Sequence, residues 1–321
     1  MLEILIDNKD GNVWDISGLV SSVSWDTVRI GKPSKLEVTF IKGAIYEDKS
    51  FKYNNGDIIR FRKDGMNVFY GYIFDINSGK DELVKVTAYD QLRYLLANDT
   101  YVFKNVTAIQ VIKQIADDFR LKTGVLSDAG YKIPTLVEDN KKLLDIIYKS
   151  LDLTLINTGR NYVLLDDFGE ISLRNVEDMK LDFVLGDGSL MYDYDYKRSI
   201  DSDTYNRVKI VRNNKKTKRR DVYMAQSNTI GKWGLLQLYQ TADENANDAQ
   251  IKQLLDTLMR VKNRESKIFT IKAIGDIRVR AGCYLPVIIE EIGINQYFLV
   301  DECSHSIEGE DHTMTVDLKV I

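Results

Sequence analysis

The 321 residues are 44% hydrophobic and 29% charged, an ordinary balance for a globular protein that excludes a disordered or collagen-like chain. The formal net charge of -4 argues against a protein that coats nucleic acid, because non-specific affinity for DNA comes from neutralising phosphates with Lys and Arg, and we expect no sequence-specific nucleic-acid partner. No apolar run approaches the roughly 18 residues that a membrane-spanning helix needs, so we expect a chain made and folded in a cytoplasm, with no direct membrane insertion.

Short alternating segments dominate residues 1–90. Apolar and polar residues alternate in them with the period of strands that bury one face. The segments are 35–41, 57–62, 67–74 and 83–89. Gly56 and Gly65 lie in turn sequences between them, where a glycine is free to take positive φ. The pattern predicts a first β-domain built as a small barrel or closed sheet.

The period changes to that of helices in residues 91–189, which predict a small α/β region. A first helix over 107–120 places its apolar residues on one face, and Thr107 and Gln110 have the spacing of a capping box. A second helix is expected over about 141–151. Residues 153–174 then predict a hairpin, with turns at Thr158-Gly159-Arg160 and at Phe168-Gly169.

Residues 190–321 return to strand patterns and are interrupted by one amphipathic helix at roughly 244–262. The order of features after Gly282, with a strand, a turn, FLVD ending at Asp301, a turn and a last strand, resembles the order after Gly56, where YIFD ends at Asp75. This similarity predicts a duplicated β-domain. A chain with two such domains builds a ring of pseudo-six-fold symmetry when it forms a trimer.

Catalytic chemistry has few residues to work with, because the chain has only two histidines, His305 and His312. With Asp301 and Cys303 they form a possible metal cluster, in which Cys303 and His305 lie two apart on one strand face. A second thiol at ligand spacing is missing unless Cys283 lies beside the cluster. We therefore favour packing in the core and at its edge, expect both cysteines to be reduced and buried, and predict no metal, no cofactor and no catalytic residues.

Three acidic motifs also have simpler readings than catalysis. Asp167-Phe168-Gly169 resembles a kinase magnesium motif but lacks the companion motifs, so a hairpin turn is expected. The pairs Asp193/Asp195 and Asp201/Asp203 could be glycosidase carboxylates or calcium ligands. In MYDYDYK, however, the tyrosines share one strand face and the aspartates the other, which predicts a solvated face.

The basic run KKTKRR covers Lys215 to Arg220, between two predicted strands. A solvated hairpin tip is the default interpretation, and contact with the acidic surface of a partner is the alternative.

Several segments resemble the baseplate hub proteins of PBSX-like prophages and related contractile phages and bacteriocins, a family related to phage late-control protein D. The segments are Lys132 to Thr154, Tyr162 to Asn175, Ser199 to Val211 and Tyr297 to Leu318. None of these segments contains a catalytic motif. Residues 1–100 contribute to the resemblance mainly through their pattern of apolar and polar residues and contain few distinctive sequence motifs.

The resemblance implies an α+β, mainly β fold with two tube-like β-barrel domains (1–90 and 190–321) flanking a peripheral α/β region (91–189). It further implies a structural, non-enzymatic homotrimer in the baseplate of a virion tail, assembled in the bacterial host cytoplasm. There the hub would join the six-fold tail tube protein to the three-fold central spike protein, beside other baseplate proteins and the tape-measure protein.

Two other functions remain open at this point. One is a virion-associated peptidoglycan hydrolase, whose paired carboxylates would need a cleft and one raised pKa. The other is a relative of the hub-spike of type VI secretion, which normally continues into a long β-helical spike that this chain lacks before Ile321.

Overall fold

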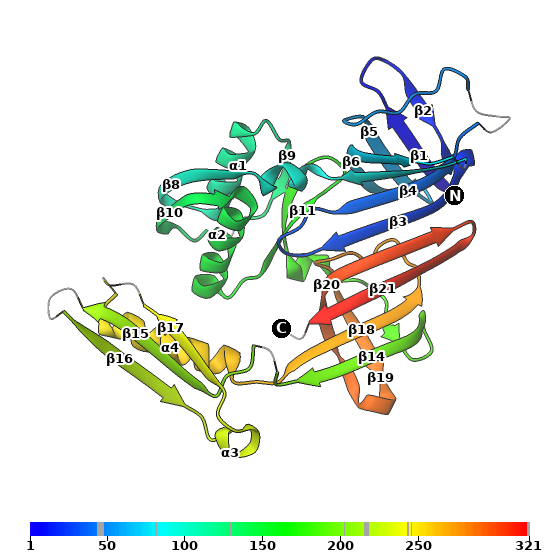
Figure 1. Ribbon diagram of the computed structural model, residues 1–321. Helices are drawn as coiled ribbons and strands as arrows, with labels where there is room; N and C mark the ends of the chain where they lie inside the picture. The colour runs from blue at the N-terminus through cyan, green and yellow to red at the C-terminus, as the bar shows by residue number, and fades with distance from the viewer. Residues whose placement is uncertain are drawn as a thin grey trace. The chain divides into compact units, whose positions relative to one another are not determined.

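The computed structural model describes residues 1–43, 48–80, 82–128, 130–201, 203–214, 218–242, 244 and 246–319 (Figure 1). The chain divides into two compact units, described separately here. The main unit contains Met1–Tyr194 and Thr270–Ile321, and the small unit contains Asp195–Phe269. No helix of the described part is long and apolar enough to cross a membrane.

The N-terminal strands form an antiparallel sheet with the spatial order β2-β1-β5-β6-β7-β4-β3. Their bounds are β1 Leu2–Asp7, β2 Val13–Asp15, β3 Val20–Val28, β4 Lys35–Ile41, β5 Ile58–Lys63, β6 Met66–Ser78 and β7 Leu83–Tyr89, with a 3-10 turn η1 at Ser17–Leu19. The four strands expected in this region are all present. Alternate residues point inward, as in β4, where Leu36, Val38 and Phe40 are fully buried.

The α/β region follows within the main unit and has its own apolar core. Its elements are η2 Gln91–Leu96, β8 Asn98–Val106, α1 Ala108–Asp118, β9 Thr123–Leu126, β10 Ile133–Lys142, α2 Leu143–Thr158, β11 Tyr162–Asp166, β12 Ile171–Asn175 and η3 Val176–Met179. Strand β8 pairs with β10, and β11, β12 and β9 form a second small sheet. The predicted capping box is confirmed, since Thr107 and Gln110 exchange hydrogen bonds at the start of α1.

The predicted end of the second helix was wrong. Helix α2 continues to Thr158, so residues 153–158 are helical instead of the first strand of a hairpin. Buried Ile147, Leu151 and Thr154 continue the helical spacing, and this burial decides against the strand alternation seen in the sequence. Gly159, at φ 70°, ends the helix in the left-handed conformation.

The C-terminal part of the main sheet has the spatial order β14-β18-β21-β20, and β19 lies on the other edge of β20 beside β13. The bounds are β13 Leu185–Gly186, β14 Met191–Ser199, β18 Ser266–Ile274, β19 Tyr284–Ile289, η4 Glu290–Ile292, β20 Ile294–Glu308 and β21 Asp311–Lys319. Strands β14 and β18 each continue from the main unit into the small unit.

Strand order agrees with the predicted internal repeat. Six strands in chain order, β1, β3, β4, β5, β6 and β7, take the spatial order β1-β5-β6-β7-β4-β3. The six later strands β13, β14, β18, β19, β20 and β21 take the matching order β13-β19-β20-β21-β18-β14. One difference is that β13 runs parallel to β19, whereas β1 is antiparallel to β5.

The two repeats also share local hydrogen bonds at one corner. The Gly56 N–H donates to the Ile73 carbonyl at 2.7 Å, and the Gly282 N–H donates to the Val300 carbonyl at 2.8 Å. Both glycines have positive φ, 89° and 93°. A register shift follows Ile73 in β6 and Val300 in β20. The second halves of β6 and β20 are therefore equivalent segments.

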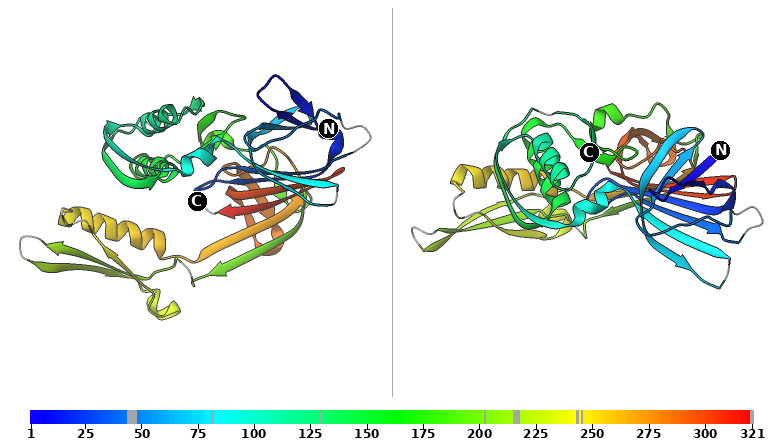
Figure 2. Two further views of the ribbon diagram at one scale, coloured as in Figure 1. Left: turned by 45° about the horizontal axis from the view of Figure 1, so that its top comes forward. Right: turned by 90° about the horizontal axis from the view of Figure 1, so that it is seen from above.

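The two predicted β-barrels are not formed, and this part of the fold prediction was wrong. The strands of both repeats belong to a single open sheet, because β3 pairs antiparallel with the second half of β20, from Val28 opposite Glu302 to Ser22 opposite Glu308. The edge of β3 that would close an N-terminal barrel is thus occupied by the other repeat. Strands β3 and β20 lie side by side in all three views (Figures 1 and 2).

The apolar core crosses this joint. Buried Trp25, Phe40 and Phe61 of the first repeat form one cluster with Ile277 and Ile307, which come from the second. The two repeats therefore share one apolar core within the main unit.

The small unit is a three-stranded sheet with one helix packed on it. Its elements are β15 Arg207–Asn214, β16 Arg219–Gln226, α3 Ile230–Trp233, β17 Gln237–Thr241 and α4 Asp248–Lys262. Helix α4 confirms the amphipathic helix expected near 244–262, and it buries Ile251 and Leu255 against Val208 and Ile210 of β15.

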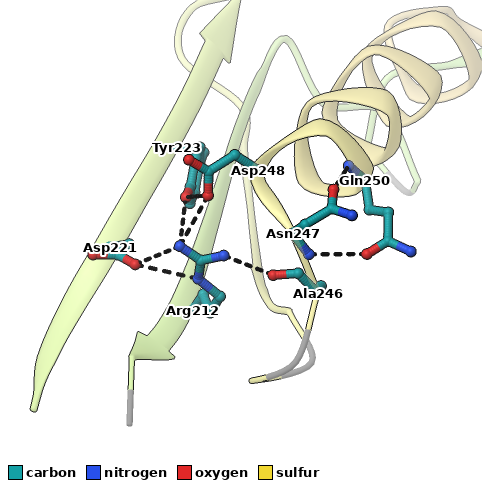
Figure 3. Close-up of polar contacts among 7 residues, drawn as sticks. All are labelled: Arg212, Asp221, Tyr223, Ala246, Asn247, Asp248 and Gln250. Atoms are coloured by element: carbon teal, nitrogen blue, oxygen red, sulfur yellow. Dashed lines mark hydrogen bonds and ion pairs between the residues drawn. The ribbon is translucent and has the colours of Figure 1, made fainter. Parts of the chain in front are cut away.

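Arg212 fixes the start of α4 to the sheet (Figure 3). Its guanidinium contacts Asp221 of β16 at 2.6 Å, Asp248 of α4 at 2.9 Å and the Ala246 carbonyl at 2.6 Å. Asn247 and Gln250 complete a capping box beside it. One cation thus joins two strands and the N-terminus of the helix.

We predict different costs for Gly56→Ala and Gly282→Ala. Both substitutions strain the backbone by about 1–3 kcal/mol, because both glycines have positive φ. An added Cβ at Gly282 also meets Val163 Cγ1 at 2.6 Å, whereas at Gly56 it meets nothing within 4 Å. Chemical denaturation of both variants should show the larger loss of unfolding free energy for Gly282→Ala. Equal losses would contradict the close packing of Gly282 on β11.

Candidate functional site

The joint between β3 and β20 is secured by Asp301, which lies at the register shift of β20. Arg29 at the end of β3 binds its carboxylate at 2.8 Å, and the Arg29 N–H donates to the Asp301 carbonyl at 2.9 Å. Lys319 of β21 binds the other carboxylate oxygen. Burial alone would raise the pKa of Asp301, but the hydrogen bonds and charges of Lys319 and Arg29 outweigh it and lower the pKa.

The α/β region is tied to the same joint. Tyr148 of α2 donates its hydroxyl proton to the Arg29 carbonyl at 2.9 Å. Arg29 therefore contacts the second repeat through its guanidinium and its backbone N–H, and the α/β region through its carbonyl oxygen.

The predicted cysteine and histidine cluster is brought together beside this joint. Cys303 Sγ lies 3.3 Å from His305 Nε2, and His305 Nδ1 lies 3.0 Å from His312 Nε2. Both Cys303 and Cys283 are buried free thiols, as expected. Asp301 is not part of the cluster, because its carboxylate is engaged by Arg29 and Lys319.

The geometry of His305 assigns its protons. Its Nε2 lies 2.8 Å from the Val279 carbonyl, which can only accept, so Nε2 carries the proton. Nδ1 then accepts the Nε2 proton of His312. Burial lowers the pKa of His305 to about 4, so the ring is neutral near pH 7. Within the described residues no group of three His, Cys, Asp or Glu side chains is placed to hold a metal.

The other acidic motifs lie in a turn, in ion pairs or at exposed positions, as expected for solvated or structural roles. Asp167-Phe168-Gly169 forms the turn between β11 and β12, with Phe168 at φ 53° and Gly169 at φ 96°. Asp193 pairs with Lys272 at 2.9 Å, and Asp195 is exposed.

Asp203 contacts Lys262 in the small unit, and Asp201 is exposed. Of the basic run, residues 215–217 lie outside the described part of the chain. Arg219 and Arg220 begin β16 and are exposed.

A buried acidic pair, Asp90 and Asp166, went unnoticed in the sequence. Asp90 accepts the N–H groups of Leu92 at 2.9 Å and Ser34 at 3.0 Å. Asp166 accepts from Gly169 at 2.6 Å and from Gln91 Nε2 at 3.2 Å. No spacing along the chain signals this pair, because its members come from the end of β7 and the end of β11.

Burial raises the pKa of Asp90 well above its ordinary value, and the nearby charge of Asp166 raises it further. Burial likewise raises the pKa of Asp166, although hydrogen bonds from Gly169 and Gln91 oppose the rise. Arg280 of the second repeat supplies the opposing charge and donates to the Asp166 carbonyl at 3.1 Å. The pair therefore joins the first repeat, the α/β region and the second repeat.

The space around this acidic pair is too small for a substrate. The cavity lined by Asp90, Asp166 and Arg280 has a volume of about 10 Å³, which is room for about one water molecule. A raised carboxyl pKa is one mark of a glycosidase acid, but a sugar ring cannot reach these groups. Their arrangement supports a structural role.

We predict that Arg280→Met destabilises the chain more at pH 8 than at pH 5. Because the folded-state pKa of both acids is raised, lowering the pH protonates them in the folded state and removes the charge that Arg280 offsets. The expected loss is on the order of 2 kcal/mol at pH 8. Denaturation at both pH values measures it, and exposed Arg278→Met is the matched control. A loss independent of pH would contradict this account.

We also predict that His305 stays neutral down to about pH 5, as the Nε2–H tautomer, because its pKa is lowered to about 4. Nitrogen-15 NMR of the imidazole rings across pH 4 to 8 reports tautomer and midpoint together. A midpoint near 6.5, or spectral changes on adding zinc, would contradict the neutral hydrogen-bonded chain.

We compared the sequence and the fold with those of known proteins. A family model described as YqbQ-like matches residues 23–319. The phage-like element PBSX protein XkdQ of Bacillus subtilis (strain 168) is 33% identical over 303 residues, which is 94% of this chain and 92% of XkdQ.

Among solved structures, the 43 kDa tail protein of prophage MuSo2 from Shewanella oneidensis matches with a TM-score of 0.74 at 15% identity, over 99% of this chain and 98% of that one. The E. coli c3393 protein, a component of the type VI secretion system, matches with a TM-score of 0.57 at 11% identity, over 100% of this chain and 77% of that one. The fold is therefore that of prophage tail proteins, and the chain belongs to the YqbQ-like family.

Proposed function

We propose that this protein is the structural hub of the baseplate in a contractile phage-type tail, where it joins the six-fold tail tube to the three-fold central spike. The observation that carries the proposal is the internal repeat. Two sets of six strands share one spatial order and are joined edge to edge through β3 and β20.

The repeat matters because of symmetry. A three-fold spike and a six-fold tube meet through equivalent contacts when a subunit between them presents both symmetries. Three chains with two similar β-domains each present six domains, and so offer a pseudo-six-fold face to the tube. In this proposal residues 1–90 and 190–321 supply those domains, and residues 91–189 form the peripheral region.

The proposed partners are two further copies of this chain, the tail tube protein, the central spike protein, other baseplate proteins and the tape-measure protein. The proposed place is the baseplate of a virion tail that is assembled in the bacterial host cytoplasm. The name of XkdQ, a phage-like element protein, and the Shewanella tail protein support this setting.

A structural role without catalysis fits the site geometry. The chain's two histidines are hydrogen-bonded to each other, with His305 buried and His312 half-buried, and Asp90 and Asp166 are enclosed. The observations favour this reading over a peptidoglycan hydrolase, which needs paired carboxylates at an open cleft.

We predict that the working unit contains three copies of the chain. Native mass spectrometry of the chain alone, and again with its spike partner, should give a trimer in at least one sample. Images of intact particles should show three copies around the tail axis. Six copies or one copy around that axis, with no trimer in either sample, would refute the hub proposal.

A further inference from the structure

Two strand edges are open in the main sheet, and they belong to the counterparts of the two strands, β3 and β20, that join the repeats within the chain. Strand β14 is an end strand of the sheet, and among the described strands it pairs only with β18. Strand β6 pairs with β5 only as far as Tyr72, opposite Ile58, so the same edge has no strand partner from Phe74 to Ser78 among the described residues. Open edges present unpaired N–H and C=O groups that invite another strand.

The repeat identifies the strand that each edge fits. By spatial order β14 is the equivalent of β3, and β6 is the equivalent of β20. Strand β3 occupies the second half of β20, beyond the end of β19. Within the chain, β14 does not pair with the second half of β6, which is the equivalent position.

We propose that β14 of one copy pairs antiparallel with the second half of β6 in the next copy, repeating between chains the joint that β3 and β20 make within each chain. The inference rests on the proposed hub function and names its partner surface. Three such joints between chains would alternate with three within them, and the main sheets would continue around the ring.

The register of β14 follows from its contacts with β18. The ring of Tyr196 packs on Phe269 of β18, with centroids 5.6 Å apart. In the first repeat Trp25 lies opposite Leu36 of β4, the strand equivalent to β18. Tyr196 thus takes the place of Trp25, and Lys197 takes the place of Asp26.

A second contact supports the same alignment. Thr270 of β18 donates to the Asp317 carboxylate of β21, and in the first repeat Glu37 of β4 lies opposite Thr87 of β7. Asp317 and Thr87 are equivalent, because each pairs with the first residue after the register shift of the long strand. Thr270 therefore corresponds to Glu37, which is consistent with Phe269 corresponding to Leu36.

Counting from that shift gives the partner residues on β6. Asp75 and Asn77 correspond to Glu302 and Ser304. Ser304 lies opposite Asp26 within the chain, and its hydroxyl donates to the Asp26 carboxylate. Asn77 of one copy should therefore lie opposite Lys197 of the next.

Charge supports the pairing. Asp75 lies two residues before Asn77 on the same strand face, so it is a diagonal neighbour of Lys197 across the joint. Both side chains are exposed, and within the described residues neither has an ion-pair partner. The proposed joint gives each of them a partner of opposite charge.

Cysteine cross-linking tests the pairing directly. We expect the full-length double variant Asn77→Cys/Lys197→Cys to form disulfide-linked dimers and trimers under mild oxidation at high protein concentration. The wild-type chain is a control, because its two cysteines are buried. The matched control is Asn67→Cys/Lys197→Cys, since Asn67 is exposed on the same strand where β5 already occupies the edge.

The outcomes separate this joint from the hub proposal when native mass is measured on the same samples. A trimer without cross-links, or equal cross-linking of the control, would overturn the β14–β6 joint and leave the hub standing. A chain that stays monomeric without cross-links at every concentration would also overturn the joint. Cross-linked ladders beyond three copies would keep the joint and overturn the ring of three.

A charge exchange provides an independent measurement. Lys197→Glu places like charges across the joint and should weaken self-association by about 1.5- to 5-fold per interface. Asp75→Lys combined with Lys197→Glu should restore it. Failure of the double variant to recover would count against the register.

Discussion

The pairing of β3 with β20 is the interaction on which the rest of the main unit depends. It joins strands that are some 280 residues apart in sequence, from Val28 opposite Glu302 to Ser22 opposite Glu308, and it converts two similar sheets into one. The core follows the joint, since Ile307 packs with Trp25 in a single apolar cluster. Without this pairing each repeat would expose an edge and part of its apolar face.

Buried polar groups make the joint specific as well as stable. Arg29 reaches Asp301 across it, and Arg280 reaches the Asp166 carbonyl and offsets the charges of the acidic pair. The hydrophobic effect depends little on the orientation of the groups that are buried. These hydrogen bonds, in contrast, form only in one register of β3 against β20. A slip by one residue would leave buried charges without partners, which is far more costly than a lost apolar contact.

The edge-to-edge pairing of the two repeats also bears on the proposed assembly. If the proposed hub is correct, a subunit that repeats one sheet motif and joins the two copies through their edges would carry, in its own fold, a template for joining the next subunit. The open edges of β14 and β6 are equivalent to the two that meet within the chain. A structural role needs such surfaces more than it needs a cleft, which is consistent with the enclosed state of the Asp90 and Asp166 carboxyls.

Local pattern in the sequence determined most of the elements and much of the chemistry. Alternation predicted β4 and β7 to the residue, the Thr107–Gln110 capping box predicted the start of α1, and the scarcity of histidine argued against catalysis. Tertiary structure decided three other matters. Burial of Thr154 extended α2 through a segment that alternates like a strand. Pairing of β3 with β20 left the sheet open where barrels were expected, because the partner of an edge strand lies too far along the chain for any local pattern to name it. The buried Asp90–Asp166–Arg280 group likewise exists only in three dimensions, since desolvation and opposing charge depend on what the fold brings together.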